Sequence, residues 1–226
     1  MTYRRLYLLG FTGAPGSGKD TCAAVLRRHG YQSIAFADAL RAEIVQAWRI
    51  DPRMLTDRAT KEWPLPALAV GMCNDPHFIR WAVYHGHSLL DPRSARWLLQ
   101  RWGTDYRRGQ DENYWVHVVD RWIRRRHGLG CNHLVITDVR MANEAGLLAS
   151  LGGRLVRVHR ADITPLAGDT GGHSSEVEAR LITEAQAIHN DAGLDALPGE
   201  VERVVHALFG AGALPNQAVI PTGAPQ

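Results

Sequence analysis

A glycine-rich segment near the N-terminus carries the residues best suited to bind phosphate. Residues 13–21 read Gly-Ala-Pro-Gly-Ser-Gly-Lys-Asp-Thr and follow an apolar run at residues 6–11. Glycine tolerates backbone conformations that a Cβ disfavours, so the N–H groups of such a turn can converge on one anion. A helix that follows adds the positive end of its dipole, and Lys19 can reach the outer phosphates of a nucleotide. The segment therefore predicts a phosphate-binding P-loop between a strand and a helix.

The position after the lysine departs from the usual P-loop pattern. In the usual pattern a Ser or Thr follows the lysine directly, and its hydroxyl binds Mg²⁺. Here Asp20 holds that position, and Thr21 supplies a hydroxyl one residue later. This spacing resembles nucleoside monophosphate kinases such as the adenylate kinases, in which a Gly separates Lys from Thr. The predicted ATP-binding residues are Gly13, Ala14, Gly16, Ser17, Gly18, Lys19, Asp20 and Thr21, and Asp20 and Thr21 are candidate metal ligands.

The composition fits one sizeable domain that handles phosphorylated small molecules. The chain has 226 residues, of which 45% are hydrophobic, and no apolar run approaches the length of a membrane span. The N-terminus leads straight into the first predicted strand, so we expect no signal peptide, and three scattered cysteines fit a reducing cytoplasm. A net charge of +3 does not require nucleic acid. We expect a cytoplasmic monomer or homodimer that binds neither membrane nor nucleic acid.

Predicted strands alternate with predicted helices along the chain. The strands are expected at residues 6–11, 32–37, 133–137, 154–159 and 185–189. The helices are expected at 21–29, 39–48, 91–102 (from Asp91-Pro92 to Gly103), 114–127, 143–151, 174–181 and 197–209. This alternation predicts a three-layer α/β fold in which helices flank a parallel sheet.

The remaining segments carry no strong periodicity. Residues 50–90 hold prolines and read as an insertion of short helices and loops, and residues 160–173 read as a loop. We expect one kinase-sized domain over residues 1–209 and a mobile tail over 210–226. In parallel sheets, ligands gather at the carboxyl ends of the strands. The P-loop, Asp38, Asp138 and the loop at 160–173 should all lie at that edge.

Several further segments, in this order, carry a family resemblance. They are Phe36-Ala37-Asp38-Ala39-Leu40-Arg41, Arg96-Trp97-Leu98-Leu99-Gln100 with Gly103-Thr104-Asp105, Ile136-Thr137-Asp138-Val139-Arg140 with Asn143-Glu144, His173-Ser174-Ser175-Glu176, and His189-Asn190-Asp191. With the P-loop, their order and spacing resemble the phage-type deoxynucleoside monophosphate kinases over about residues 6–209. The resemblance implies the P-loop nucleoside monophosphate kinase-like fold. It also implies transfer of the γ-phosphoryl group of ATP, with Mg²⁺, to a deoxynucleoside monophosphate.

The resemblance suggests roles for charged residues outside the P-loop. Asp138, at the end of an apolar strand, has the position of a metal-holding carboxylate, although it could instead cap a helix or pair with Arg140. Guanidinium groups could neutralise charge on the transferred phosphoryl group. The catalytic candidates are Lys19, Asp38, Asp138, Arg140 and Arg160, with Arg157 as a further arginine of the same kind, and the metal candidates are Asp20, Thr21 and Asp138. The loop after Arg160 could act as a lid.

The acceptor candidates lie on two predicted helices. Asp38 could orient the surroundings of the acceptor phosphate or a metal-bound water, or simply cap the helix that follows it. Arg41 lies one turn later and could grip the acceptor phosphate with two N–H groups, or be a solvated surface residue. Arg96 and Gln100 are four residues apart, so a charge and an amide project together toward a base edge, or form a plain polar face.

Two other functions remain open at this point. The chain could be a P-loop kinase of another small acceptor, like dephospho-coenzyme A kinase, or a nucleic-acid-associated ATPase that uses Arg124–Arg126 as a phosphate-contacting patch. A zinc site at Cys73, His77, His85 and His87 is disfavoured, because the spacing matches no common structural zinc site.

Overall fold

The computed structural model describes residues 5–57, 59–161, 186–191, 195–210 and 212–215. The chain divides into two compact units. The first, here called the sheet unit, consists of Met1–Ala35 and Asp120–Gln226. The second, the helical unit, consists of Phe36–Val119 and includes the insertion expected at residues 50–90. Residues 162–173 of the loop expected at 160–173, and the whole helix expected at 174–181, lie outside the described residues.

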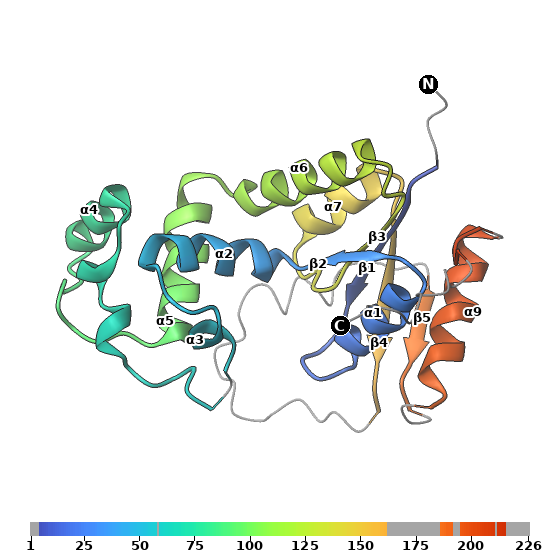
Figure 1. Ribbon diagram of the computed structural model, residues 1–226, viewed down its shortest axis with the longest axis horizontal. Coiled ribbons are helices and arrows are strands. Elements are labelled where there is room, and N and C mark those ends of the chain that lie inside the picture. The colour runs from blue at the N-terminus through green and yellow to red at the C-terminus, as the bar shows by residue number, and fades with distance from the viewer. Residues whose placement is uncertain (1–4, 58, 162–185, 192–194, 211, 216–226) are drawn as a thin grey trace, which may run out of the picture. The chain divides into compact units, whose positions relative to one another are not determined.

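The sheet unit is built on five parallel strands, as the sequence predicts (Figure 1). The strands are β1 (Tyr7–Thr12), β2 (Gln32–Ile34), β3 (His133–Ile136), β4 (Arg154–His159) and β5 (Gln186–His189). Their order is β2-β3-β1-β4-β5, so β1 is central and pairs with β3 on one side and β4 on the other. The segment after β1 therefore leaves the sheet at its middle, where it is flanked by the ends of two neighbouring strands.

Helices cover both faces of this sheet, which confirms the three layers (Figure 1). On one face, α1 (Lys19–Arg28) and α9 (Leu197–Phe209) bury side chains against Phe11, Val158 and Ile188. On the other face lies α7 (Ala142–Ser150), whose Leu148 approaches β1 so closely that a Cβ on Gly10 would lie 2.8 Å from its side chain. The alternation of inward side chains along each strand produces these two buried faces.

The helical unit packs short helices around a cluster of aromatic rings. Its elements are α2 (Phe36–Trp48), α3 (Arg53–Thr56), the 3₁₀ turns η1 (Pro66–Leu68) and η2 (Val70–Met72), α4 (Pro76–Tyr84), α5 (Ala95–Gln100) and the π-helical segment η3 (Arg101–Arg108). The helix α6 (Tyr114–Gly128) begins in this unit. Trp48, Phe78, Trp102 and Tyr106 meet edge to face or tilted, with ring centroids 4.8–5.4 Å apart. Such contacts favour one packing of the core.

The strand predicted at residues 32–37 is too long, and the helix predicted at residues 39–48 starts too late. Strand pairing between β2 and β3 ends at Ile34 and Ile136, and α2 already begins at Phe36. Asp38 therefore lies inside the first turn of α2, where its carboxylate suits the positive end of the helix dipole.

The helix predicted from Asp91-Pro92 to Gly103 is wrong at both ends. Arg93 exchanges backbone hydrogen bonds with Leu65, at N–O distances of 2.9 and 3.3 Å, which hold it in an extended conformation. The helix α5 starts only at Ala95, with the Ser94 hydroxyl accepting from the Trp97 N–H. At the other end, Gly103 lies within η3 and permits close packing, because a Cβ there would lie 2.9 Å from the Leu40 side chain.

The first described residues of the segment predicted as a mobile tail pack against the sheet unit. Ala213 is fully buried in the core of the sheet unit, and its carbonyl accepts a hydrogen bond of 2.8 Å from the Tyr31 hydroxyl. The Gly212 carbonyl lies 3.1 Å from His133 Nε2. Residues 216–226 lie outside the described residues. Residues 212–215 thus belong to the fold, because Ala213 accepts a hydrogen bond from a buried hydroxyl that would otherwise be unpaired.

Replacing Tyr31 with Phe should lower the stability of the protein. Burial raises the pKa of Tyr31, so its hydroxyl stays a neutral donor, and the variant leaves the Ala213 carbonyl without its partner. The expected cost is about 1–3 kcal/mol in unfolding free energy, measured by urea denaturation. An unchanged midpoint and slope would contradict the role given to this bond.

Candidate nucleotide-binding site

The segment between β1 and α1 has the backbone of a phosphate-binding loop. Gly13, Gly16 and Gly18 have φ angles of +139°, +80° and +104°, a region that glycine adopts without strain. A Cβ on Gly13 would lie 2.4 Å from the Val158 carbonyl oxygen, and one on Gly18 would lie 2.5 Å from Asn190 Nδ2. Space and conformation therefore both require glycine at positions 13 and 18.

Lys19, the first residue of α1, lies across this loop. Its Nζ donates to the carbonyls of Gly13 and Ala14, at 2.7 and 2.8 Å. Burial lowers the pKa of Lys19 below its ordinary value, and the positive charge of Arg140 lowers it further. The carboxylates of Asp20 and Asp138 act in the opposite direction. The structure thus brings together four of the predicted site residues, Lys19, Asp20, Asp138 and Arg140, from two separate segments of the chain.

The turn after β3 is held by a buried glutamate that our sequence reasoning named only within a family segment. Glu144 is 3% exposed, and its Oε2 accepts from the N–H groups of Arg140 and Met141, at 2.8 and 3.2 Å. The Val139 N–H donates to the Phe11 carbonyl at 2.9 Å, which ties the same turn to β1. Both contacts fix the backbone that carries Asp138 and Arg140. Glu144 could have been found from its spacing, because a glutamate in the first turn of a helix often reaches back to N–H groups.

The other two predicted arginines lie on or beside β4. Arg157 is the register partner of Thr12, the last residue of β1, and Arg160 is exposed just after the strand ends. The buried hydroxyls of Thr12 and Ser17 have no hydrogen-bond partner within the described part of the chain. An unpaired buried hydroxyl typically costs about 1–3 kcal/mol, so a polar ligand here would relieve that cost. Phosphate oxygens supply the acceptors that such hydroxyls need.

The candidate metal ligands have the chemistry that Mg²⁺ prefers. Asp20 and Thr21 lie exposed on the first turn of α1, and Asp138 is partly buried. Mg²⁺ in nucleotide sites usually takes one or two protein oxygens and completes its shell with phosphate and water. Among the described residues, no group of three or more His, Cys, Asp or Glu side chains is arranged to hold a metal ion. The carboxylate and hydroxyl oxygens of Asp20, Thr21 and Asp138 fit such a partial set of ligands.

The acceptor candidates all lie in the helical unit. On α2, Arg41 Nη1 donates to Asp38 Oδ1 at 2.8 Å, so these two form an ion pair one turn apart. On α5, Arg96 is largely exposed and pairs with Glu62, while Gln100 is the last residue of the helix. The structure therefore joins Asp38 to Arg41 directly and places Arg96 and Gln100 on one helix.

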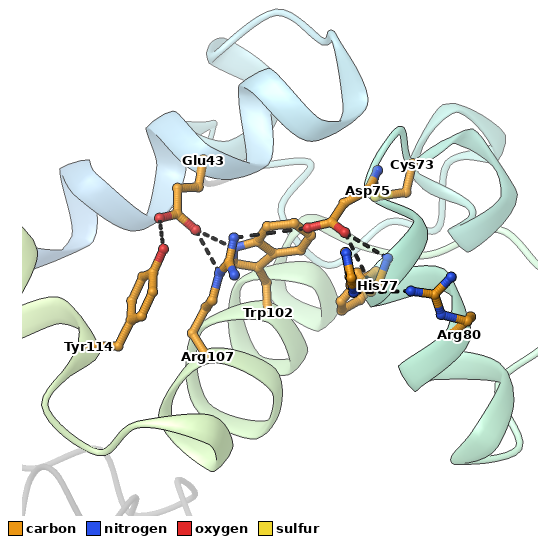
Figure 2. Close-up of polar contacts among 9 residues, drawn as sticks. Glu43, Cys73, Asp75, His77, Arg80, Trp102, Arg107 and Tyr114 are labelled. Carbon is orange, nitrogen blue, oxygen red and sulfur yellow. Dashed lines mark hydrogen bonds and ion pairs between the residues drawn. The ribbon is translucent and has the colours of Figure 1, made fainter.

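A polar network in the same unit escaped our sequence reasoning. Figure 2 shows Glu43 of α2 accepting hydrogen bonds from Trp102 Nε1 at 2.9 Å, Arg107 Nε at 2.9 Å and the Tyr114 hydroxyl at 2.5 Å. The Arg107 guanidinium also lies about 5 Å from the ring centroids of Trp102, Tyr106 and Tyr114. Glu43 and Arg107 look like ordinary helical residues in the sequence, because their partners are 59 to 71 positions away from Glu43.

This network fixes α2, the helix that carries the acceptor candidates Asp38 and Arg41. It connects α2 to η3 and to the start of α6, and Arg107 also reaches Asp75, which caps α4 (Figure 2). An open cavity of about 560 Å³ lies beside it, lined by Glu43, Gln46, Ala47, Arg49, Asn74, Asp75, Trp102 and Arg107. A fully paired polar network specifies one arrangement of the elements it joins.

The basic run at the end of α6 is partly engaged within the protein. Arg124 pairs with Asp120 at 2.9 Å, and Arg126 lies over the Trp122 ring at 5.6 Å. These contacts weaken the reading of Arg124–Arg126 as a free phosphate-contacting patch. Within the described residues, no helix is long and apolar enough to cross a membrane.

Comparison with known proteins identifies relatives in sequence and in fold. No family model matches the chain. A protein of Acanthamoeba polyphaga mimivirus named "Putative deoxynucleotide monophosphate kinase" is 32% identical over 190 residues, which cover 78% of this chain and 84% of the viral protein. Dephospho-CoA kinase from Campylobacter jejuni has a similar structure, with a TM-score of 0.50, 13% identity and coverage of 89% of this chain and 96% of its own. The structure of TT1252 from Thermus thermophilus aligns with a TM-score of 0.45 at 20% identity, over 91% of this chain and 97% of its own.

The parallel sheet, the P-loop between β1 and α1, and the likeness in fold to dephospho-CoA kinase define a P-loop kinase fold of the α/β class. The sequence relationship is more specific, because it extends over more than three quarters of the chain. The chain belongs to the deoxynucleoside monophosphate kinase family.

Replacing Glu43 with Gln should destabilise the helical unit. The amide keeps the size of the side chain but cannot accept from all three donors, and it loses the charge that pairs with Arg107. We expect a loss of about 1.5–3 kcal/mol in unfolding free energy, measured by urea denaturation. The matched control is Asp51→Asn, which breaks the exposed Asp51–Arg53 pair and should change stability little. Equal effects of the two substitutions would contradict a special role for the Glu43 network.

Proposed function

We propose that this protein transfers the γ-phosphoryl group of ATP to a deoxynucleoside monophosphate, giving a deoxynucleoside diphosphate and ADP. The observation that carries the proposal is the placement of Lys19 across a glycine loop beside Asp20, Asp138 and Arg140, in a member of this family. Phosphoryl transfer demands positioning and charge neutralisation more than covalent chemistry from the protein. We propose that the enzyme acts in the cytoplasm, where its nucleotide substrates are found.

The donor binds at the P-loop in this proposal. Backbone N–H groups of Gly16 and Gly18 and the N-terminus of α1 hold the phosphate chain, and Lys19 exchanges its loop carbonyls for phosphate oxygens. Mg²⁺ bound with ATP would neutralise charge on the outer phosphates, with Asp138, Thr21 and Asp20 as the residues that hold it. Arg140, Arg157 and Arg160 would stabilise the negative charge of the phosphoryl group as it leaves ATP.

The acceptor binds through the helical unit in this proposal. Arg41 offers a planar pair of N–H groups that matches a phosphate, and Asp38 holds its guanidinium in place. Burial of Arg41 Nε, which has no partner in the described part of the chain, is consistent with a ligand at this position. Arg96 and Gln100 supply a charge and an amide to the nucleoside, since an amide can pair with a base edge.

An assay of ADP release across the four deoxynucleoside and four ribonucleoside monophosphates tests the proposal. Turnover that depends on a free deoxynucleoside monophosphate is the expected result. Dephospho-coenzyme A and double-stranded DNA serve as alternative additions. Turnover driven by dephospho-coenzyme A, or hydrolysis stimulated by DNA without an acceptor, would replace the proposed function with one of the other two.

Replacing Lys19 with Ala should abolish phosphoryl transfer and preserve the fold. The lysine contacts only loop carbonyls among the hydrogen bonds of the described residues, so its loss affects the ligand more than the core. Removing one preorganised donor to developing charge typically costs about a hundredfold to a thousandfold in rate. The coupled ADP assay measures the rate, and circular dichroism checks the fold. Turnover near that of the wild type would rule out the assignment of the P-loop as the donor site.

Replacing Arg41 with Ala should raise the KM for the nucleoside monophosphate by about tenfold to a hundredfold and leave the KM for ATP nearly unchanged. The reason is that a charge-assisted bond to the acceptor is lost while the P-loop is intact. The matched control is Arg53→Ala, because Arg53 is an exposed arginine of the same unit and its side chain is 88% exposed. Equal increases in both KM values would remove Arg41 from the acceptor site.

A further inference from the structure

Asn190 follows the last strand of the sheet and reaches the P-loop from outside it. The residue is 8% exposed, and its backbone N–H donates to the His159 carbonyl at 2.8 Å, which extends the pairing of β4 and β5 by one residue. Its side-chain Nδ2 donates to the Ser17 carbonyl at 3.0 Å in a buried contact. The backbone bond alone continues the strand pairing. The side chain is therefore not needed for the strand pairing, and it binds the P-loop 173 positions earlier in the sequence.

The bond to Ser17 fixes the orientation of one peptide group. A trans peptide is planar, so its carbonyl oxygen and its N–H point in opposite directions. Because the Ser17 carbonyl points toward Asn190, the N–H of Gly18 points away from β5. That N–H has no acceptor within the described part of the chain, so it is available for an anion. The Gly18 carbonyl, by contrast, accepts the first helical bond of α1, from the Cys22 N–H at 2.9 Å.

The same contact explains the conformation of Gly18. Its φ angle of +104° turns the chain from the loop into α1, and a Cβ at this position would lie 2.5 Å from Asn190 Nδ2. The asparagine thus occupies the space that a side chain on Gly18 would need. Loop and asparagine are fitted to each other in shape as well as in hydrogen bonding.

We propose that Asn190 is a positioning residue for the donor: its amide holds the Ser17–Gly18 peptide so that the Gly18 N–H faces the phosphate chain of ATP. The inference rests on the proposed function for the identity of the donor and deepens it by assigning a residue outside the loop. Asn190 touches the loop backbone and acts through it. Loss of its amide donor frees the Ser17 carbonyl to turn, and a carbonyl turned inward would repel the phosphates.

Two variants and one matched control test the proposal. Asn190→Ala removes the side chain, and Asn190→Asp keeps its shape but replaces the donor with an acceptor. The control is Tyr31→Phe, which removes another buried side-chain hydrogen bond to a backbone carbonyl in the same unit. Each protein is titrated by calorimetry with Mg·ATP and with inorganic tripolyphosphate, and is unfolded in urea. The KM for the nucleoside monophosphate is measured separately.

Both Asn190 variants should lower the affinity for Mg·ATP and for tripolyphosphate by about tenfold. The reason is that the Gly18 N–H loses one well-placed hydrogen bond to a charged phosphate. The KM for the nucleoside monophosphate should stay unchanged, and Tyr31→Phe should bind both donors like the wild type. If Asn190→Ala does not fold, Asn190→Asp decides alone.

Affinities equal to the wild type, or an equal loss of affinity in Tyr31→Phe, would reduce Asn190 to a structural residue and overturn the inference. Failure of the proposed function gives a different result. A wild-type protein that binds tripolyphosphate but shows no turnover with any deoxynucleoside monophosphate would refute that function. In that case the effect of the Asn190 variants on tripolyphosphate affinity would still test the positioning role of Asn190.

Discussion

The close approach of the P-loop backbone to the ends of β4 and β5 is the constraint on which the rest of the site depends. Gly13 lies against the carbonyl of Val158, and Gly18 lies against the amide of Asn190, at distances that exclude any Cβ. The hydrogen bond from Asn190 holds the Ser17 carbonyl outward, so the N–H of Gly18 remains for an anion. Lys19 then follows as the first residue of α1, so the position of its charge is set by the same contacts.

In the helical unit, a polar network positions the helices. The elements of this unit are short, and a short helix is marginal without tertiary contacts. Glu43 supplies such contacts, because one carboxylate satisfies donors from η3 and α6 at once (Figure 2). Arg107 adds contacts to three aromatic rings. In this unit the Glu43 carboxylate therefore fixes the arrangement of the helices. Because the Asp38–Arg41 pair also lies on α2, the same carboxylate fixes the position of that pair.

The accuracy of the sequence-based predictions depends on how local each signal is. The strands of the sheet, the P-loop and α9 were predictable because apolar runs, glycine spacing and helical periodicity act over a few residues. The helix expected from Asp91 was wrong because Leu65, 28 positions earlier, pairs with Arg93 and holds it extended. The contacts of Ala213 were not predictable for the same reason, since its partner Tyr31 lies 182 positions earlier. Glu43 carries no local pattern, Asn190 was named only within a family segment, and only the fold reveals the partners of both residues.

The charge balance around Lys19 connects the structure to the proposed chemistry. A partly buried ammonium is costly, and burial lowers the pKa of this lysine accordingly. Two loop carbonyls and the carboxylates of Asp20 and Asp138 offset that cost by favouring the charged form. The phosphates of a nucleotide favour the charged form more strongly than the carbonyls do, because they carry full negative charges. The site is therefore built to hold a positive charge in place before the ligand arrives, and a preorganised charge costs no rearrangement when the phosphoryl group moves.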